Sequence, residues 1–405
     1  MNCRFKPLLA STILLFGITG CGSSHPAAPS AGAAAPVPII AARAAGLDQS
    51  IFRQTWMEVV PLDNGQRITR LFVDRDLVLA CTPGNSVFGI AKSNGVLNFS
   101  HDVRGGGQEV GRPIVFPNRI IYTTQSSLEI YSRATGNFDK SVPLGFSISS
   151  DAVGSQDDIY LGINVMGGEL ADLNLAAAYV PIRWRMVAYG QVSGMPALYQ
   201  NTLYIGNSVG SVYAVNTDRT PLWPLDYDRF DVGGSIVGDV VADDEGVYAS
   251  SSTGRLVCLD RNSGRLRWQY LSPKQFDSGP IVTRTSVYQY VPEMGLAAID
   301  KTHQIVIDPH NSHKVEDVNR SPRWICPEAV QFICEDRLFT YVRTNDNQIW
   351  ILDRLTGAVR YRSGKTRFTS IGINTTDSTI YGATDDGAVY AITPVLRPGG
   401  PGFLE

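Results

Sequence analysis

The sequence of 405 residues predicts an all-β fold, a β-propeller of about eight four-stranded blades. Two observations lead to this prediction: a strand–turn–strand phrase recurs about every 42 residues, and its turns contain Gly. A third is an aromatic residue at a fixed place in the strands. Solenoids of a similar period are helical, whereas this pattern has the periodicity of strands. The sequence therefore favours a closed ring of small sheets.

The clearest copy of the phrase runs from Gly246 to Trp268. Residues 247–250 and 256–259 are predicted to be strands joined by a Thr-Gly turn. A third strand begins at Leu266, after an Asn-Ser-Gly turn. Gly is favoured in such turns because it adopts positive φ without steric cost.

The period is marked by the residue that ends the second visible strand of each copy. These markers are Ala91, Ser132, Asn174, Asn216, Asp260, Asp300, Asp353 and Thr393. The spacing is 40 to 44 residues, except for 53 residues between Asp300 and Asp353. The sixth copy is therefore expected to contain an insertion.

The last copy lacks an outer strand, because a Pro- and Gly-rich tail follows Thr393. A strand-like segment with an aromatic residue, Trp56, precedes the first copy at 54–60. We expect this segment to supply the missing strand, which would close the ring and leave few exposed sheet edges. The expected limits are 50–396 for the propeller and 397–405 for a C-terminal tail.

The first 20 residues are predicted to be a signal peptide. Arg4 and Lys6 precede a short apolar run, which ends in Ile-Thr-Gly before Cys21. This ending resembles the lipobox of bacterial lipoproteins, which implies that Cys21 receives a diacylglycerol. The alternative is an ordinary secretory signal with an incidental cysteine.

Residues 21–49 are expected to be a flexible tether, because most of their side chains are too small to form a core. Residue 22 is Gly rather than Asp, and the lipoprotein resemblance then implies the outer membrane, facing the periplasm. No later segment approaches the length of a transmembrane helix, so the predicted attachment is a lipid anchor.

The net charge of −3 falls to −5 when Arg4 and Lys6 are removed with the signal peptide. A mildly acidic body argues against a nucleic-acid partner. The ring is expected to be a monomer.

Four cysteines follow Cys21. Cys81 and Cys258 fall in predicted strands and are expected to be buried as small apolar residues. Cys326 and Cys334 are near each other in the sequence, so a disulfide between them remains an alternative.

Residues 260–268 (Asp-Arg-Asn-Ser-Gly-Arg-Leu-Arg-Trp) and 353–361 resemble the quinoprotein-type, or PQQ-like, repeat family. The resemblance covers about residues 65–395 and is weak in the third and sixth copies. It implies four-stranded blades in a ring, with an aromatic residue of each outer strand docked against the next blade. The corresponding residues are Trp56, Phe99, Trp223, Trp268 and Tyr361.

The family name raises the question of quinone-dependent catalysis, which in those enzymes involves adjacent cysteines and a bound Ca²⁺. This sequence has no adjacent Cys pair and no Cys-x-x-Cys-His motif. Residues 206–210 match the G-x-S-x-G motif of hydrolases, but predicted strands flank Ser208 on both sides. We therefore expect no catalytic residue and no cofactor.

The insertion in the sixth copy contains His303, His310 and His313, which are weak candidates for metal ligands. A solvated loop that happens to carry histidines is the favoured interpretation.

The third copy replaces its turn with an apolar segment that carries Tyr179, Arg183 and Trp184. These residue types are enriched at protein–protein hot spots, so the three are candidates for partner binding. The alternative is that the segment folds back on its own blade.

A lipid-anchored propeller of this repeat resembles the scaffold lipoproteins of the outer-membrane β-barrel assembly machinery. The resemblance implies a non-catalytic scaffold in the cell envelope that binds envelope proteins. The alternatives are a periplasmic PQQ-dependent dehydrogenase and a carbohydrate- or peptide-binding propeller.

Overall fold

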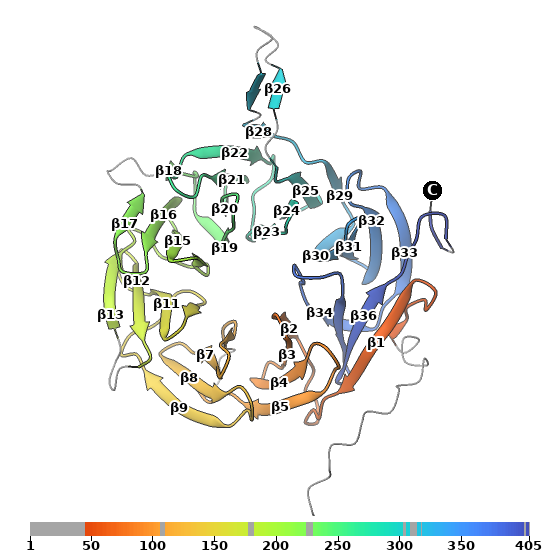
Figure 1. Ribbon diagram of the computed structural model, residues 1–405, viewed down its shortest axis with the longest axis horizontal. Helices are drawn as coiled ribbons and strands as arrows, with labels where there is room; N and C mark the ends of the chain where they lie inside the picture. Colours follow the sequence, from red (N-terminus) through yellow and green to blue (C-terminus); the bar gives the residue numbers. More distant parts are fainter. Residues whose placement is uncertain are drawn as a thin grey trace, which may run out of the picture. The chain divides into compact units, whose positions relative to one another are not determined.

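The described residues form eight sheets arranged in a ring around a central axis, without α-helices (Figure 1). The computed structural model describes residues 45–105, 110–176, 182–223, 230–302, 305–307, 314–316, 318–400 and 402–404. Each sheet is one blade of four main strands, so the expected eight-bladed β-propeller is confirmed.

Each blade runs from an innermost strand at the central axis to an outermost strand at the rim (Figure 1). In that order, blade 1 contains β2 (Arg70–Val73), β3 (Leu77–Cys81), β4 (Ser86–Ala91) and β5 (Leu97–Asp102). Blade 2 contains β6 (Ile114–Val115), β7 (Arg119–Thr123), β8 (Ser127–Ser132) and β9 (Phe138–Pro143). Blade 3 contains β10 (Val153–Ser155), β11 (Asp158–Ile163), β12 (Glu169–Asn174) and β13 (Ile182–Val187). Blade 4 contains β14 (Ala197–Tyr199), β15 (Thr202–Gly206), β16 (Ser211–Asn216) and β17 (Pro221–Trp223), with β18 (Phe230–Asp231) also paired to β16.

Blade 5 contains β19 (Ile236–Ala242), β20 (Val247–Ser251), β21 (Arg255–Leu259) and β22 (Leu266–Leu271), with β28 (Asn319–Arg320) added at its outer edge. Blade 6 contains β23 (Ile281–Val282), β24 (Ser286–Val291), β25 (Gly295–Asp300) and β29 (Trp324–Cys326). Blade 7 contains β30 (Ala329–Glu335), β31 (Phe339–Thr344), β32 (Gln348–Asp353) and β33 (Val359–Lys365). Blade 8 contains β34 (Phe368–Ile371), β35 (Ile380–Thr384), β36 (Ala388–Pro394) and β1 (Phe52–Val59).

The last blade is completed by the N-terminal strand, as expected. β1 pairs antiparallel with β36, from Phe52 opposite Pro394 to Val59 opposite Ala388. Packing against this blade begins before residue 50, because Ala45 and Leu47 are already buried in its core.

The insertion of the sixth copy lies between β25 and β29. Its short strands β26 (Ile305–Ile307) and β27 (Lys314–Glu316) form a separate hairpin that projects from the rim of the ring (Figure 1). The next strand, β28, pairs in parallel with β22 of blade 5. The insertion therefore links two blades before the chain returns to complete blade 6.

Burial follows the position of a strand in its blade. Every residue of β20 and β35 is buried, because a central strand is covered on both faces by the neighbouring blades. In the outer strands β5 and β13, exposed residues alternate with half-buried or buried ones, because only one of their faces is covered.

We expect deletion of residues 52–59 to remove at least about 5 kcal/mol of stability, because Phe52 and Trp56 would no longer be buried and β36 would become an exposed edge. Thermal unfolding followed by circular dichroism measures the loss. The control is removal of the β26–β27 hairpin, which forms its own sheet. An unchanged melting temperature of the 52–59 deletion would contradict the closure role of β1.

Candidate functional site

Aromatic side chains of the outer strands lie in the seams between blades. The indole N–H of Trp56 donates to the carbonyl of Lys92 at 2.9 Å, and that of Trp223 donates to the carbonyl of Arg261 at 2.8 Å. In both seams the acceptor carbonyl belongs to the residue that directly follows the period marker of the next blade, which is Ala91 or Asp260. The structure places the other three expected docking residues, Phe99, Trp268 and Tyr361, in buried positions on outer strands.

A glycine in the turn of the next blade makes this contact possible. A Cβ atom on Gly264 would lie 2.6 Å from the ring of Trp223, and one on Gly95 would lie 2.7 Å from the ring of Trp56. Both glycines also have positive φ, at +69° and +77°. Each glycine therefore allows the turn and lets the indole lie against it.

Two docking residues were not assigned from the sequence. The indole of Trp184 donates to the carbonyl of Thr217 at 3.0 Å, and that of Trp324 donates to the carbonyl of Arg354 at 3.0 Å. Insertions before β13 and β29 move both tryptophans away from the regular spacing. A search for an aromatic residue after each insertion would have found them.

The interpretation of Trp184 as a partner-binding residue is corrected by its position. Its side chain is 8% exposed and fills the seam between blades 3 and 4, so a partner cannot reach it. Arg183, at the start of β13, is half exposed, and its guanidinium lies 2.8 Å from the carboxylate of Asp158. Tyr179 lies outside the described residues.

The other expected sites take structural positions or fall outside the description. His303, His310 and His313 lie outside the described residues. Ser208 is in the turn between β15 and β16, and its hydroxyl accepts the backbone N–H of Gln191 at 2.9 Å. Among the residues that the structure describes, no cluster of three or more His, Cys, Asp or Glu side chains is arranged to hold a metal ion. Likewise, no helix within these residues is long and apolar enough to cross a membrane.

The four described cysteines are free and buried, which confirms the expectation for Cys81 and Cys258. Cys326 and Cys334 form no disulfide, because they lie in separate apolar clusters. Burial raises the pKa of the Cys258 thiol to about 12, which keeps it protonated at neutral pH.

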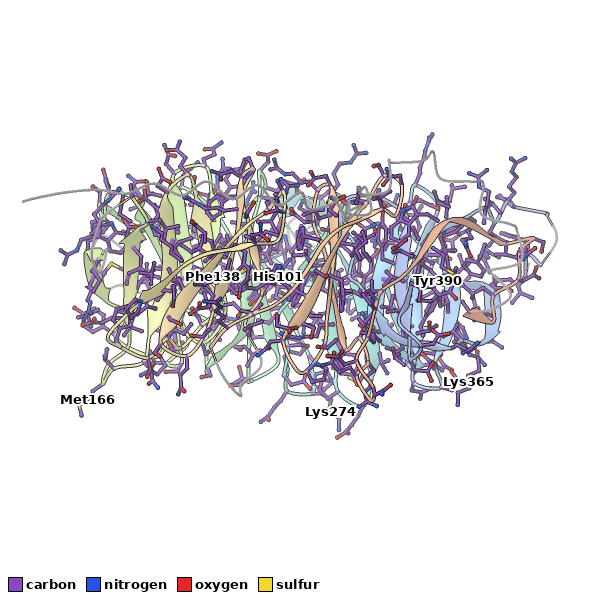
Figure 2. All side chains as sticks on the ribbon, turned by 90° about the horizontal axis from the view of Figure 1, so that it is seen from below. His101, Phe138, Met166, Lys274, Lys365 and Tyr390 are labelled. Carbon is purple, nitrogen blue, oxygen red and sulfur yellow. The ribbon has the colours of Figure 1, made fainter. Side chains whose placement is uncertain are left out.

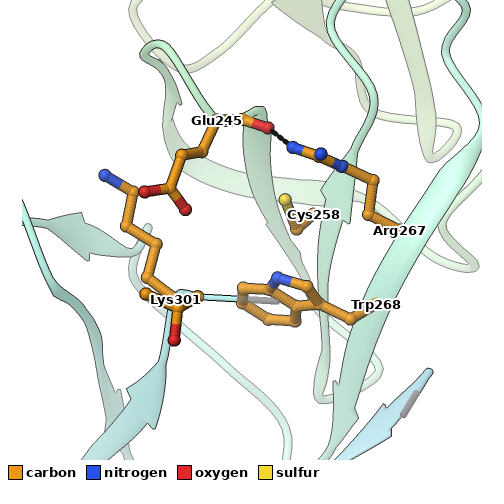
Figure 3. Close-up of a pocket in the computed structure, with 6 residues that line it drawn as sticks. Glu245, Cys258, Arg267, Trp268 and Lys301 are labelled. Carbon is orange, nitrogen blue, oxygen red and sulfur yellow. Dashed lines mark hydrogen bonds between the residues drawn. The ribbon is translucent and has the colours of Figure 1, made fainter. Parts of the chain in front are cut away.

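A pocket of about 440 Å³ opens at the seam between blades 5 and 6 (Figure 3). Trp268 and Cys258 line it together with three charged residues, and the guanidinium of Arg267 donates to the carbonyl of Glu245. The Lys301 ammonium is bound to the Asp243 carboxylate at 2.5 Å. These cations therefore already have partners within the protein.

Four exposed apolar residues lie on adjoining segments of blades 3 and 4. Figure 2 shows Met166, Lys274 and Lys365 on the same side, which we call the lower face. Met166 lies in the turn between β11 and β12, and Val209 lies in the turn between β15 and β16. Val187 ends β13 and Tyr189 follows it. Met166 is fully exposed, and the other three are each about half exposed; together we call them the apolar patch.

The segments that carry the apolar patch are joined by backbone hydrogen bonds. The N–H of Gly190 donates to the carbonyl of Gly167 at 2.8 Å, and the N–H of Ser208 donates to that of Gln191 at 2.8 Å. Tyr189 itself has φ +54°, an uncommon conformation for a non-glycine residue. The loop between blades 3 and 4 therefore bridges both turns and presents the tyrosine to solvent.

The seam between blades 3 and 4 contains a buried carboxylate. Asp172 is fully buried between Tyr160 and Trp184 in the sheet register, and its oxygens have no hydrogen-bond donor among the described residues. The nearest cation is the Nε of Arg183 at 3.7 Å. Burial, with a smaller contribution from the charge of Asp158, raises the pKa of Asp172 to about 6, and Arg183 opposes this change.

The third blade is unusual in placing a charged residue between its tyrosine and its tryptophan. At the same register the blades with a Tyr–Trp pair otherwise have small, uncharged side chains: Ala214, Cys258, Ala298 and Ala391. Blade 3 therefore holds a costly group at a position where alanine suits the same packing.

Sequence comparison relates the chain to one family. A family described as outer membrane protein assembly factor BamB matches residues 208–306. Outer membrane protein assembly factor BamB of Taylorella asinigenitalis (strain MCE3) is 25% identical over 211 residues, which cover 48% of this chain and 52% of the relative. The match thus spans about half the length of this curated relative.

Solved structures show the same fold. BamB from Moraxella catarrhalis superposes with a TM-score of 0.62 at 17% identity, covering 85% of this chain and 98% of that one. A computationally designed protein, Ika8, superposes with a TM-score of 0.59 at 14% identity, covering 84% and 100%.

The repeats, the ring and the docked outer strands define the chain as an eight-bladed β-propeller of the PQQ-like type. It is similar to BamB in sequence over part of its length and in fold, which supports the resemblance noted in its repeats.

We expect Trp223→Ala to destabilise the protein by about 3–5 kcal/mol, because the change leaves a cavity against Gly264 and removes a hydrogen bond. Leu271→Ala, at the exposed end of β22, should change stability by less than about 0.5 kcal/mol. Chemical denaturation measures both variants. Equal losses of unfolding free energy in the two variants would show that the seam contact stabilises the protein no more than an exposed leucine does.

We expect Asp172→Asn to stabilise the protein at pH 7.5 by about 1–3 kcal/mol, because the folded state there contains a buried charge. The pKa of Asp172 is higher in the folded state, so the penalty grows as the pH rises from about 4 to about 6. The gain should therefore disappear near pH 4, and denaturation at both pH values tests this.

Asp63→Asn is the control, because it removes a carboxylate charge from an exposed loop away from this seam. It should not stabilise the protein at pH 7.5. A gain for Asp172→Asn that is the same at both pH values would contradict the assigned cause.

Proposed function

We propose that the chain is a lipid-anchored scaffold that takes part in outer-membrane protein assembly. The observation that carries this proposal is the similarity, in sequence and in fold, to outer membrane protein assembly factor BamB. The predicted lipid anchor at Cys21 is part of the proposal and would hold the propeller at the outer membrane, on its periplasmic side.

The apolar patch is the surface that we propose for partner contact. Monomeric proteins expose single apolar side chains widely, but four on adjoining segments suggest an interaction site. A rigid patch also loses little conformational entropy on binding, because its loops are already held by hydrogen bonds.

The two strongest candidates for a nucleophile support a non-catalytic role. The pKa of Cys258 is raised to about 12, and Ser208 lies in a tight turn, with its hydroxyl accepting a backbone N–H. A serine nucleophile needs a neighbouring general base and an exposed position between a strand and a helix. Neither residue has the surroundings of an activated nucleophile.

The test is affinity purification of the tagged chain from cross-linked envelopes of its own host, followed by mass spectrometry. The patch variant combines Met166→Ser, Tyr189→Asn and Val209→Ser. Asn is chosen at position 189 because it tolerates positive φ. The control is Leu355→Ser, an exposed leucine in the turn between β32 and β33.

We expect the wild-type chain and the Leu355→Ser control to recover barrel-assembly proteins, and the patch variant to lose most of them. Equal recovery by the patch variant would show that the patch is not the contact. Recovery of no assembly protein by the wild-type chain would contradict the scaffold role itself.

Cys21→Ser tests the anchor separately. The wild-type chain should carry a lipid on its N-terminal cysteine by mass spectrometry and should fractionate with membranes. The variant should lack the lipid and be released from membranes. Membrane fractionation of the unlipidated variant at the wild-type level would contradict anchoring through Cys21.

A further inference from the structure

The central channel contains a cavity of about 940 Å³, larger than the pocket at the seam between blades 5 and 6. Residues of all eight blades line it, so no single blade forms the site. A cavity of this volume is within the range that holds small ligands or a side chain with its flanking backbone. The seams and the apolar patch do not account for it.

Glycines allow close backbone packing at the wall of the cavity on the side of blades 4–6. A Cβ atom on Gly194 would lie 1.8 Å from the carbonyl oxygen of Gly238, and one on Gly238 would lie 2.2 Å from the nitrogen of Gly279. The loops that enter the innermost strands therefore touch backbone to backbone. No side chain of these three residues projects into the channel.

The wall of the cavity is largely apolar. Val240 and Ile281 lie on the innermost strands of blades 5 and 6, and Val330 and Ile373 face the cavity from blades 7 and 8. Val330 is 39% exposed and Ile373 is 42% exposed, which is high for large aliphatic residues in a concave wall. A ligand with an apolar body would remove this surface from water.

The cavity wall formed by blades 5 and 6 carries negative charge. Asp239 and Asp277 line it, and the backbone N–H of Met195 donates to the Asp239 carboxylate at 3.0 Å. The guanidinium of Arg112 is the neighbouring cation, at 4.0 Å from Asp239, and both side chains are about half exposed. Such a long, solvated pair contributes little stability, so Asp239 can accept a second cationic group.

Neighbouring groups strengthen this polarity. Asp151 lies at the mouth of the channel beside Asp239, where its carboxylate accepts the backbone N–H of Arg112 at 3.1 Å. Arg70 and Arg343 lie on the opposite arc, in an adjoining cavity of about 340 Å³. A bound cation is therefore attracted toward blades 3–6 and repelled by the arc of blades 7 and 1.

We propose that the channel binds an amphipathic cation, an apolar chain that ends in an ammonium or guanidinium group. The cationic group lies at Asp239, and the apolar chain lies along Val330 and Ile373. Small amines and basic side chains of extended peptides share this chemistry. The site is separate from the apolar patch and does not depend on the proposed function.

The test is isothermal titration calorimetry of the purified full-length mature chain with hexylammonium, hexanol and hexanoate. These probes share an apolar chain and differ in the charge of the end group. We expect hexylammonium to bind about tenfold more tightly than hexanoate, with hexanol between them. Equal affinities of hexylammonium and hexanoate would overturn the proposal.

Asp239→Asn should lower the affinity for hexylammonium to that for hexanol and leave hexanol binding unchanged. Asp63→Asn, on an exposed loop, makes the same change of charge away from the channel and should have no effect. Ile373→Ser should lower the affinities for hexylammonium and for hexanol by the same factor. Unchanged hexylammonium binding by Asp239→Asn would place any binding elsewhere and contradict the site.

A last arm distinguishes the two sources of such a cation. An acetylated and amidated Leu-Lys-Leu peptide presents the same ammonium on an extended backbone. Tighter binding than hexylammonium, lost in Asp239→Asn, indicates a protein segment as the ligand. Weaker binding, with hexylammonium still dependent on Asp239, indicates a small amine.

Discussion

The indole of an outer-strand tryptophan, lying against the turn between the third and fourth strands of the next blade, is the contact that recurs most often between blades. A four-stranded sheet cannot bury both of its faces alone, so each blade needs a fixed neighbour on either side. The indole fixes the distance by packing on the turn and fixes the register by donating its N–H to one carbonyl. The four pairs with this bond are Trp56 with Lys92, Trp184 with Thr217, Trp223 with Arg261, and Trp324 with Arg354.

The fold could be predicted from the sequence because the same constraint acts on every copy. Turn glycines and strand aromatics recur at a fixed distance wherever the seam repeats, so the period, the blade number and the closing strand could all be inferred. The role of residues 52–59 could be inferred because the last copy lacks an outer strand. The inference therefore depended on the closure of the whole ring and not on the segment alone.

The docking residues of blades 3 and 6 could not be placed in the same way. Insertions move Trp184 and Trp324 away from the regular spacing, although both return to the same seam position in space. An exposed position could not be inferred either, because a strand pattern does not say which apolar turn residues a neighbouring loop will cover. The sequence therefore did not show that Met166 and Val209 are exposed, or that Trp184 is buried.

Blades 2 and 3 depart most from the shared seam. Lys140 takes the outer-strand position in blade 2, and its ammonium donates to the carbonyl of Leu175 at 3.4 Å. Blade 3 then adds the buried Asp172 to its seam with blade 4, and the same two blades carry the apolar patch. Local rules of stability are often broken near functional surfaces, and here the least favourable seam and the exposed patch share one pair of blades.

The pairing of β1 with β36 also governs how the chain is made. Phe52 and its partner Pro394 are more than 300 residues apart, so the first strand to be synthesised is the last to find its place. Until β36 emerges, seven blades can stack in order while β1 waits with an unpaired edge. Such a long-range final step is slow, because it requires closure of a loop that spans nearly the whole chain. Before it pairs, this strand is the part of the protein that most needs protection from edge-to-edge association.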